Sequence, residues 1–139
     1  MLNGKKPAMN DYWLCKCVDI GFFVFHISLI LFNLLAWIWA RTRKWHLVSL
    51  LLIVLSWFGL GIFYGWGYCF ITDWHWGVRR QIGLEVTSNS YIHFLILETT
   101  GVDLPETLVD QFTFIIFFIL LFISLILNIR DLLHKRRSQ

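Results

Sequence analysis

The chain has 139 residues, of which 58% are hydrophobic, 18% are aromatic and only 15% are charged. A soluble domain of this length could not bury so much apolar surface, so the composition excludes an ordinary water-soluble protein and predicts one domain, residues 1–139, in a lipid bilayer. Lys and Arg number twelve against nine Asp and Glu. Because the basic residues cluster at the ends of apolar stretches, as membrane topology requires, a nucleic-acid partner is not expected.

Three apolar stretches are each long enough to cross the hydrocarbon layer, which needs roughly 20 helical residues. Residues 20–40 are uncharged, and they are too long for a signal peptide and lack its cleavage site. Residues 47–71 are also uncharged, and the short turn before them predicts an antiparallel hairpin. The third span, residues 105–130, starts at Pro105, which suits a first helical turn. The predicted fold is therefore all-α, a polytopic membrane protein with three transmembrane helices.

The connection before the last span, residues 72–104, is too polar for the hydrocarbon layer and too long for a structureless loop. It therefore predicts short interfacial helices. Thr72 can cap the first of them, and residues 88–90 can cap a second one that stops at Gly101. The apolar run that begins at Tyr91 is too short to span a bilayer, so we expect it to lie at the interface or partly buried.

The distribution of charge and of aromatic rings predicts the orientation in the cell membrane. The turn at residues 41–46 and the tail from Arg130 onward share one side and are rich in Lys and Arg, so the positive-inside rule places the C-terminus in the cytoplasm. Trp and Tyr favour the headgroup layers at both boundaries. The expected groups are Trp37, Trp39 and Trp45 at the inner boundary, and Trp66, Tyr68, Trp74 and Trp76 at the outer one.

Polar side chains that could carry chemistry gather on the predicted outer side. The predicted spans hold no charge, which disfavours an ion-coupled carrier, and no known catalytic spacing is present, so no catalytic residue or cofactor is assigned. His26 lies in the outer part of the first span, and the side chains that can meet it there are Cys69, His75, His93 and Glu98. Imidazole and thiolate bind zinc or copper, but no HxxxH or CxxC occurs, so metal binding stays open.

The other polar residues have structural interpretations. His26 can instead be a buried residue that hydrogen-bonds to a neighbour such as Tyr91. His46 is expected at the opposite interface, and His134 is expected to be solvated in the basic tail. Asn33 is expected to form a hydrogen bond across the bundle.

The cysteines and glycines leave further alternatives open. Cys15, Cys17 and Cys69 all fall on the predicted outer side, so Cys69 either forms a disulfide with one of the others, in an oxidising compartment, or all three are unpaired. Gly61 and Gly65 form a GxxxG pattern, which lets helix backbones approach closely. The packed helix belongs either to the same chain or to a second copy or membrane partner.

The residues from Gly65 to Gly83, GWGYCFITDWHWGVRRQIG, are more specific than any periodicity. They resemble the signature of a bacterial inner-membrane family known as domain of unknown function 2784, in which a Gly-Trp-x-Cys-Pro-Leu-Thr segment closes a helix and one branch reads CPLTDWHW. Phe70 stands where that family usually has Pro. The resemblance implies a membrane fold and an important outer segment, but no activity. The matching positions are Cys69, Thr72, Asp73, Trp74, His75, Trp76, Arg79 and Arg80.

The outer segment also has a physical interpretation. Trp74 and Trp76 can anchor it in the headgroups, and Arg79 and Arg80 can reach lipid phosphates. These features favour a non-enzymatic structural or accessory membrane component. The alternative is an outer-face site for a metal or a small molecule, such as a lipid or quinone, built from His26, Cys69, His75 and His93.

Overall fold

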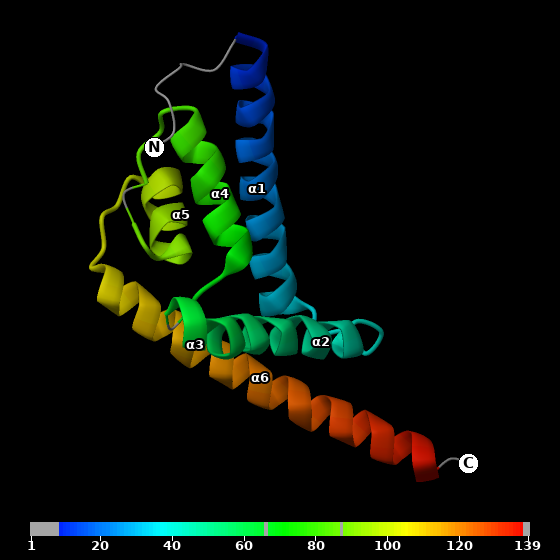
Figure 1. Ribbon diagram of the computed structural model, residues 1–139. Coiled ribbons are helices and arrows are strands. Elements are labelled where there is room, and N and C mark those ends of the chain that lie inside the picture. Colours follow the sequence, from blue (N-terminus) through cyan, green and yellow to red (C-terminus); the bar gives the residue numbers. More distant parts are fainter. Residues whose placement is uncertain (1–8, 66, 87, 138–139) are drawn as a thin grey trace.

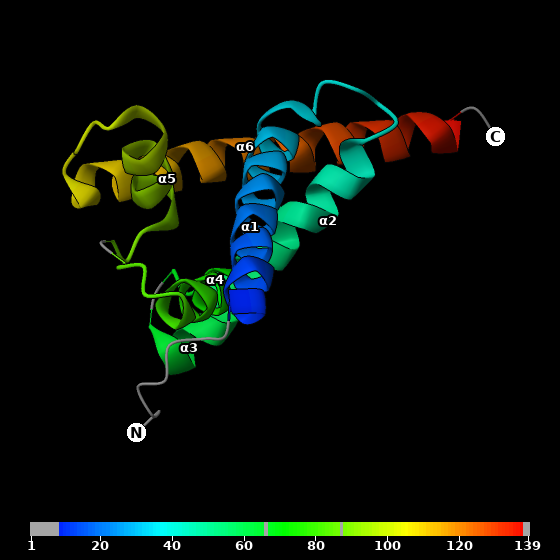
Figure 2. The same ribbon diagram turned by 90° about the horizontal axis from the view of Figure 1, so that it is seen from above.

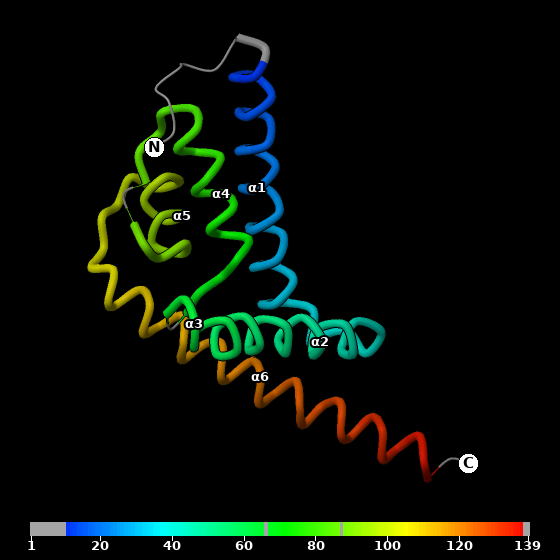
Figure 3. Tube along the Cα trace, viewed as in Figure 1, coloured from blue at the N-terminus to red at the C-terminus, as the bar shows by residue number. Residues whose placement is uncertain are grey.

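The computed structural model describes residues 9–65, 67–86 and 88–137, which form helices joined by short loops (Figure 1 and Figure 3). In chain order the helices are α1 (Met9–Leu35), α2 (Arg43–Val54), the π-helical segment η1 (Leu55–Leu60), α3 (Gly61–Tyr64), α4 (Phe70–Gln81), α5 (Tyr91–Thr100) and α6 (Glu106–Arg137). The predicted all-α class is confirmed.

Three helical stretches are long and apolar enough to cross a membrane, namely Asp11–Leu35, Arg43–Tyr64 and Glu106–Arg137. In their most apolar windows only 17%, 11% and 11% of the residues are buried inside the protein, so most of their large apolar side chains face outward. Such a surface suits lipid, in which helices also satisfy their own backbone hydrogen bonds. The predicted set of three candidate spans with short helices between them is confirmed.

The first helix is shifted toward the N-terminus relative to the expected span at residues 20–40. It ends at Leu35 because the chain turns there, and the Thr42 hydroxyl donates hydrogen bonds to backbone carbonyls of that turn. Because α1 extends back to Met9, Asp19 lies inside a candidate span. The prediction that the spans carry no charge is therefore wrong for α1.

The second span stops before the end of the expected stretch at residues 47–71. Gly65 and Gly67 have φ angles of 107° and 80°, in the left-handed region that favours glycine, so the helix ends at Tyr64 and the chain turns toward α4. Gly61 is buried in α3, but Gly65 lies beyond the helix. The two glycines of the GxxxG pattern therefore do not form one helical face.

The long helices do not run in one direction. α1 runs crosswise to α2 and α6, whereas α2 and α6 lie side by side and run in opposite directions (Figure 1 and Figure 2). The predicted antiparallel hairpin of the first two helices is therefore wrong. The short turn carries α2 across the end of α1, where His46 Nε2 donates a hydrogen bond of 2.9 Å to the backbone carbonyl of Asn33.

α4 and α5 pack beside α1 (Figure 1). α4 begins at Phe70, with Cys69 at the N-cap, so Thr72 lies inside the helix and is buried, and the prediction that Thr72 is the cap is wrong. The predicted ends of α5 are confirmed, since the Ser90 side chain accepts a hydrogen bond from the N–H of His93 and Gly101 ends the helix at a φ of 71°. A small hydrophobic core joins the helices, and it consists of Trp76, Tyr91 and Phe94 with Phe23 and Val86 against them.

Candidate functional site

A cluster of polar side chains, here called the polar cluster, is buried between α1, α4 and α5. It consists of Asp19, His26, His75, Arg79 and Tyr91. Asp19 and His26 are about two turns apart on one face of α1, and His75 and Arg79 are about one turn apart on the facing side of α4. The sequence prediction missed Asp19. Its spacing from His26 was the signal, because residues seven apart share a helix face.

Ion pairs connect the three helices of the polar cluster. The Nε2–H of His75 donates to the Asp19 carboxylate at 2.7 Å, and the Arg79 guanidinium lies 3.5 Å from the same oxygen. The other end of the guanidinium donates to Glu98 of α5 at 3.0 Å. Arg79 therefore bridges a buried carboxylate to one whose side chain is 44% exposed.

Arg79 does not point to lipid phosphates. It is only 6% exposed, and its guanidinium lies 4.6 Å from the centre of the Phe94 ring, a cation–π contact. The expected phosphate contact is wrong for Arg79, because two carboxylates and an aromatic face offer it a buried place. The Arg80 side chain is 61% exposed, 4.0 Å from Asp73, and so faces outward.

Aromatic rings enclose the two histidines of the polar cluster. The His26 ring stacks on Tyr91 with centroids 3.8 Å apart, and the His75 ring stacks on Phe22 at 5.1 Å. The two imidazoles are 6.2 Å apart. The predicted contact between His26 and Tyr91 is present as stacking, not as a hydrogen bond.

Trp76 lies in the core and not in the headgroup layer, so its predicted anchoring role is wrong; Trp74 is exposed, and Trp66 lies outside the described residues.

Several polar atoms of the polar cluster are buried without a hydrogen-bond partner. These atoms are His26 Nε2, His75 Nδ1, Arg79 Nε and Tyr91 Oη. The Nδ1–H of His26 donates to the carbonyl of Phe22 at 2.9 Å, so its Nε2 is an acceptor in the neutral ring. Since the Nε2–H of His75 donates to Asp19, its Nδ1 is likewise an acceptor. Buried polar atoms are nearly always paired, so this group calls for an explanation.

Burial shifts the pKa values of His75 on α4 and of Tyr91 on α5. Burial, with the nearby His26 and Arg79, lowers the pKa of His75 although Asp19 raises it, and the net lowering favours the neutral imidazole. Burial also raises the pKa of the Tyr91 phenol, and the charge of Asp19 adds to this effect. Both side chains are therefore neutral near pH 7.

Cys69 lies at the open edge of the polar cluster and is half-buried. Burial raises the pKa of its thiol, but the His26 imidazole, Thr72 and the backbone N–H groups of Thr72 and Ile71 lower it, and the resulting pKa is about 7. The His26 imidazole is near enough to the thiol to lower its pKa, but His26 Nε2 forms no hydrogen bond. Among the predicted site residues, the structure thus brings His26, His75 and Cys69 together, with Glu98 joined through Arg79.

His93 belongs to a different contact. Its imidazole pairs with the Ser88 hydroxyl at 2.9 Å and with the Asp103 carboxylate at 3.2 Å, and so helps to hold the loops around α5. Within residues 9–65, 67–86 and 88–137, no three His, Cys, Asp or Glu side chains are placed to hold a metal ion. The metal version of the predicted site therefore has no support from the geometry. Cys15, Cys17 and Cys69 are free thiols.

A second buried polar contact lies at the start of α2, where α1, α2 and α6 meet. His46 is completely buried, and besides the Asn33 carbonyl it contacts the Ser124 hydroxyl of α6 at 3.0 Å. The prediction of an interfacial His46 is therefore wrong, because this ring joins α1, α2 and α6. The Asn33 side chain donates to Leu29 of its own helix, and not across the bundle as predicted.

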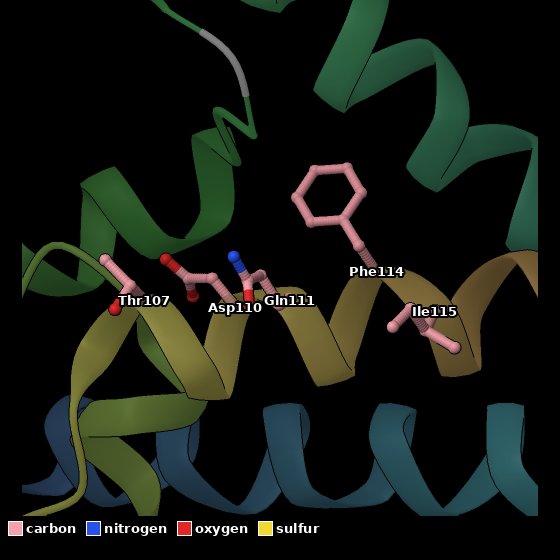
Figure 4. A pocket seen from close by; sticks show the side chains of 5 residues that line it. All are labelled: Thr107, Asp110, Gln111, Phe114 and Ile115. Carbon is pink, nitrogen blue, oxygen red and sulfur yellow. The ribbon is translucent and has the colours of Figure 1, made fainter.

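An open depression lies along the first half of α6, away from the polar cluster. It is lined by Thr107, Asp110, Gln111, Phe114 and Ile115 (Figure 4). All five residues belong to one helix, and none was predicted as a site residue. The depression therefore does not mark the predicted site.

The fold and the polar cluster define a small helical protein with three candidate membrane spans and a buried polar site beside the first of them. The chain matches the family described as "Protein of Unknown function (DUF2784)" over residues 16–129, and it belongs to that family. No curated protein and no solved structure matches the chain.

Proposed function

We propose that this membrane protein binds a small molecule that carries hydroxyl groups, and that the polar cluster is the binding site. The observation that carries the proposal is the group of buried, unpaired polar atoms on His26, His75 and Tyr91. Ionisable residues inside membrane proteins are costly and mark functional sites more often than stabilising contacts.

The chemistry of the unpaired atoms selects the class of ligand. His26 Nε2 and His75 Nδ1 are both acceptors in neutral rings, so they need donors from the ligand. An anion would bring further acceptors close to the Asp19 carboxylate, whereas a diol, a phenol or a quinol supplies two O–H donors. The half-buried Cys69 marks the side from which such a ligand would enter.

Binding of a quinol and of its quinone tests this proposal. Decylubiquinol and decylubiquinone have nearly the same size, but only the quinol donates two hydrogen bonds. We expect saturable quenching of tryptophan fluorescence by the quinol in the detergent-purified chain, with an affinity at least roughly tenfold above that of the quinone. Tyr91→Phe and His75→Gln should each weaken quinol binding.

The control variant is Trp74→Phe, whose side chain is exposed on the other face of α4 and should leave binding unchanged. Equal affinity for quinol and quinone would contradict the proposed donor requirement. Absence of saturable binding would mean that buried water satisfies the same atoms.

A structural or accessory role is the second candidate, and the ion pairs of Arg79 favour it. They join α1, α4 and α5 through Asp19 and Glu98. Under this hypothesis, Arg79→Met and Asp19→Asn each lower the stability of the folded chain, and the chain binds no ligand.

The proposed topology places the C-terminus in the cytoplasm. Arg43 of the basic turn pairs with Asp131 at 2.9 Å, just before the basic tail, so both basic segments lie at one end of the protein. This arrangement supports the same assignment by the positive-inside rule. A second copy or another membrane protein packed against the second span is a further proposal, although Gly61 and Gly65 do not share one helical face.

A further inference from the structure

Cys69 occupies a position that can stabilise a thiolate. It is the N-cap of α4, which runs for twelve residues, and its thiol lies beside the free backbone N–H groups at the start of that helix. The N–H groups of Ile71 and Thr72 favour the charged sulfur. Cys15 instead contacts Gln81 at the other end of α4, and Cys17 is exposed on α1. Cys69 therefore forms no disulfide with either of the other two cysteines.

His26 supplies a base for this thiol. The ring is held on both sides, since its Nδ1–H donates to the Phe22 carbonyl and its face stacks on Tyr91 at 3.8 Å. This hydrogen bond leaves the lone pair on Nε2, which is buried and unpaired near the sulfur. A cysteine with an oriented imidazole beside it is the arrangement that activates thiol nucleophiles.

The surroundings of Cys69 favour an acyl group as the electrophile. Cys69 follows the second candidate span, which ends at Tyr64, by five residues, and the adjacent Phe70 is 43% exposed, so the thiol lies close in the chain to apolar surface that suits a fatty chain. Disulfide exchange within the chain is excluded by the placement of the other two cysteines, both of which are on α1. Acyl transfer needs no second thiol and no oxidant.

We propose that Cys69 is an acyl-acceptor nucleophile, which takes a fatty acyl group from an acyl thioester with His26 as its general base. The thiol proton passes to His26 Nε2 while the sulfur attacks the carbonyl carbon. The bond from that carbon to the leaving sulfur then breaks, and the leaving thiol takes the proton from His26. The products are a thioester on Cys69 and a free thiol, and nothing is oxidised or reduced. This reaction goes beyond the proposed hydroxyl binding and does not depend on it.

The test compares two full-length chains that each keep one cysteine. The Cys69-only chain carries Cys15→Ala and Cys17→Ala, and the matched Cys17-only chain carries Cys15→Ala and Cys69→Ser. Each is purified in detergent, incubated with palmitoyl-CoA and followed by intact mass. We expect one palmitoyl adduct on the Cys69-only chain, removable by neutral hydroxylamine, and a rate at least roughly 100-fold above that of the Cys17-only chain.

His26→Gln in the Cys69-only chain tests whether His26 acts as the general base or only packs beside Cys69. At neutral pH we expect acylation to slow by roughly 100-fold, and the difference should shrink toward pH 9, where the thiolate forms without a base. Arg80→Gln, at a side chain of α4 that is 61% exposed and outside the polar cluster, should leave the rate unchanged. An unchanged pH profile in His26→Gln, or equal rates for the two single-cysteine chains, would overturn the proposal.

A second measurement keeps His26 in place, so it tests the proposal even if the His26→Gln variant does not fold. The alkylation rate of the Cys69-only chain with iodoacetamide should reach half its maximum near pH 7, in line with the thiol pKa of about 7. A half-maximum near pH 8.5, as for an ordinary thiol, would contradict the proposed activation.

Discussion

Replacing Arg79 by Met should destabilise the packing of α4 and α5 on α1. Met keeps an unbranched side chain over the Phe94 and Phe23 rings but removes the charge that Asp19 and Glu98 face. Removing one partner of a buried pair costs about 3–5 kcal/mol, because it leaves the other charge buried. Asp19 is buried and suffers this loss, although it keeps its bond to His75.

The half-exposed Glu98 reduces the expected cost. Water can solvate its carboxylate once Arg79 is gone, so this arm contributes about 1 kcal/mol or less. We therefore expect Arg79→Met to lower the free energy of unfolding by about 3–4 kcal/mol. The neighbouring Arg80→Met is the matched control. Its side chain is 61% exposed and 4.0 Å from Asp73, so the same change should cost no more than about 0.5 kcal/mol.

The assay is unfolding by SDS in mixed micelles with a mild detergent, followed by far-ultraviolet circular dichroism. A second background, Asp19→Asn, removes the buried charge that Arg79 neutralises. In that background Arg79→Met should cost about 1–2 kcal/mol less, since the two residues are coupled. If Arg79→Met and Arg80→Met unfold at the same SDS fraction, or if Asp19→Asn leaves the cost unchanged, the ion-pair account of this packing is wrong.

Four further predictions follow from other parts of the structure. Because burial holds the pKa of His75 below the usual value of 6.5, the unfolded chain binds the proton more tightly; stability should be level above about pH 6.5 and fall on acidification, and His75→Gln should flatten this fall in an SDS titration repeated across pH. His46→Ala should cost about 2–4 kcal/mol in the same assay, against about 1 kcal/mol for Ser124→Ala, and equal costs would contradict a three-helix junction. Gly101→Ala should cost about 1 kcal/mol because of the positive φ at Gly101, whereas Gly77→Ala, inside α4 with open space around its Cα, should be neutral or stabilising. In a cysteine-free chain in intact cells, Asn89→Cys should react with a membrane-impermeant maleimide and Arg137→Cys should not, and the reverse pattern would invert the proposed orientation.

Local features were predictable because they depend on neighbours in the sequence. The caps of α5 at Ser90 and Gly101 follow from the hydrogen-bonding capacity of a serine and the left-handed freedom of a glycine. The early end of the second span at Gly65 was not anticipated. An apolar run with glycines is compatible with a continuous helix, and only the φ angle adopted in the fold ends it.

The membership of the candidate site was only partly predictable. His26, His75 and Cys69 were singled out by residue type and by their predicted common side of the membrane, and they do come together. His93 has the same residue type and the same predicted side, but it pairs with Ser88 and Asp103, since the direction of a side chain on α5 depends on how that helix packs. Asp19 was missed because it stands one residue before the uncharged stretch, although a helix extended backward places it on the face of His26.

The amino-acid sequence alone predicted a lipid environment, the helical class and the three candidate spans, because the hydrophobicity and length of an apolar stretch depend only on adjacent residues. The tertiary structure alone decided that α1 runs across the other two long helices, that Arg79 and Trp76 turn inward while Arg80 and Trp74 turn outward, and that His46 is buried. These outcomes depend on which helix faces meet. Residues far apart in the chain, such as Asp19 and Arg79, become neighbours only when α4 packs along α1.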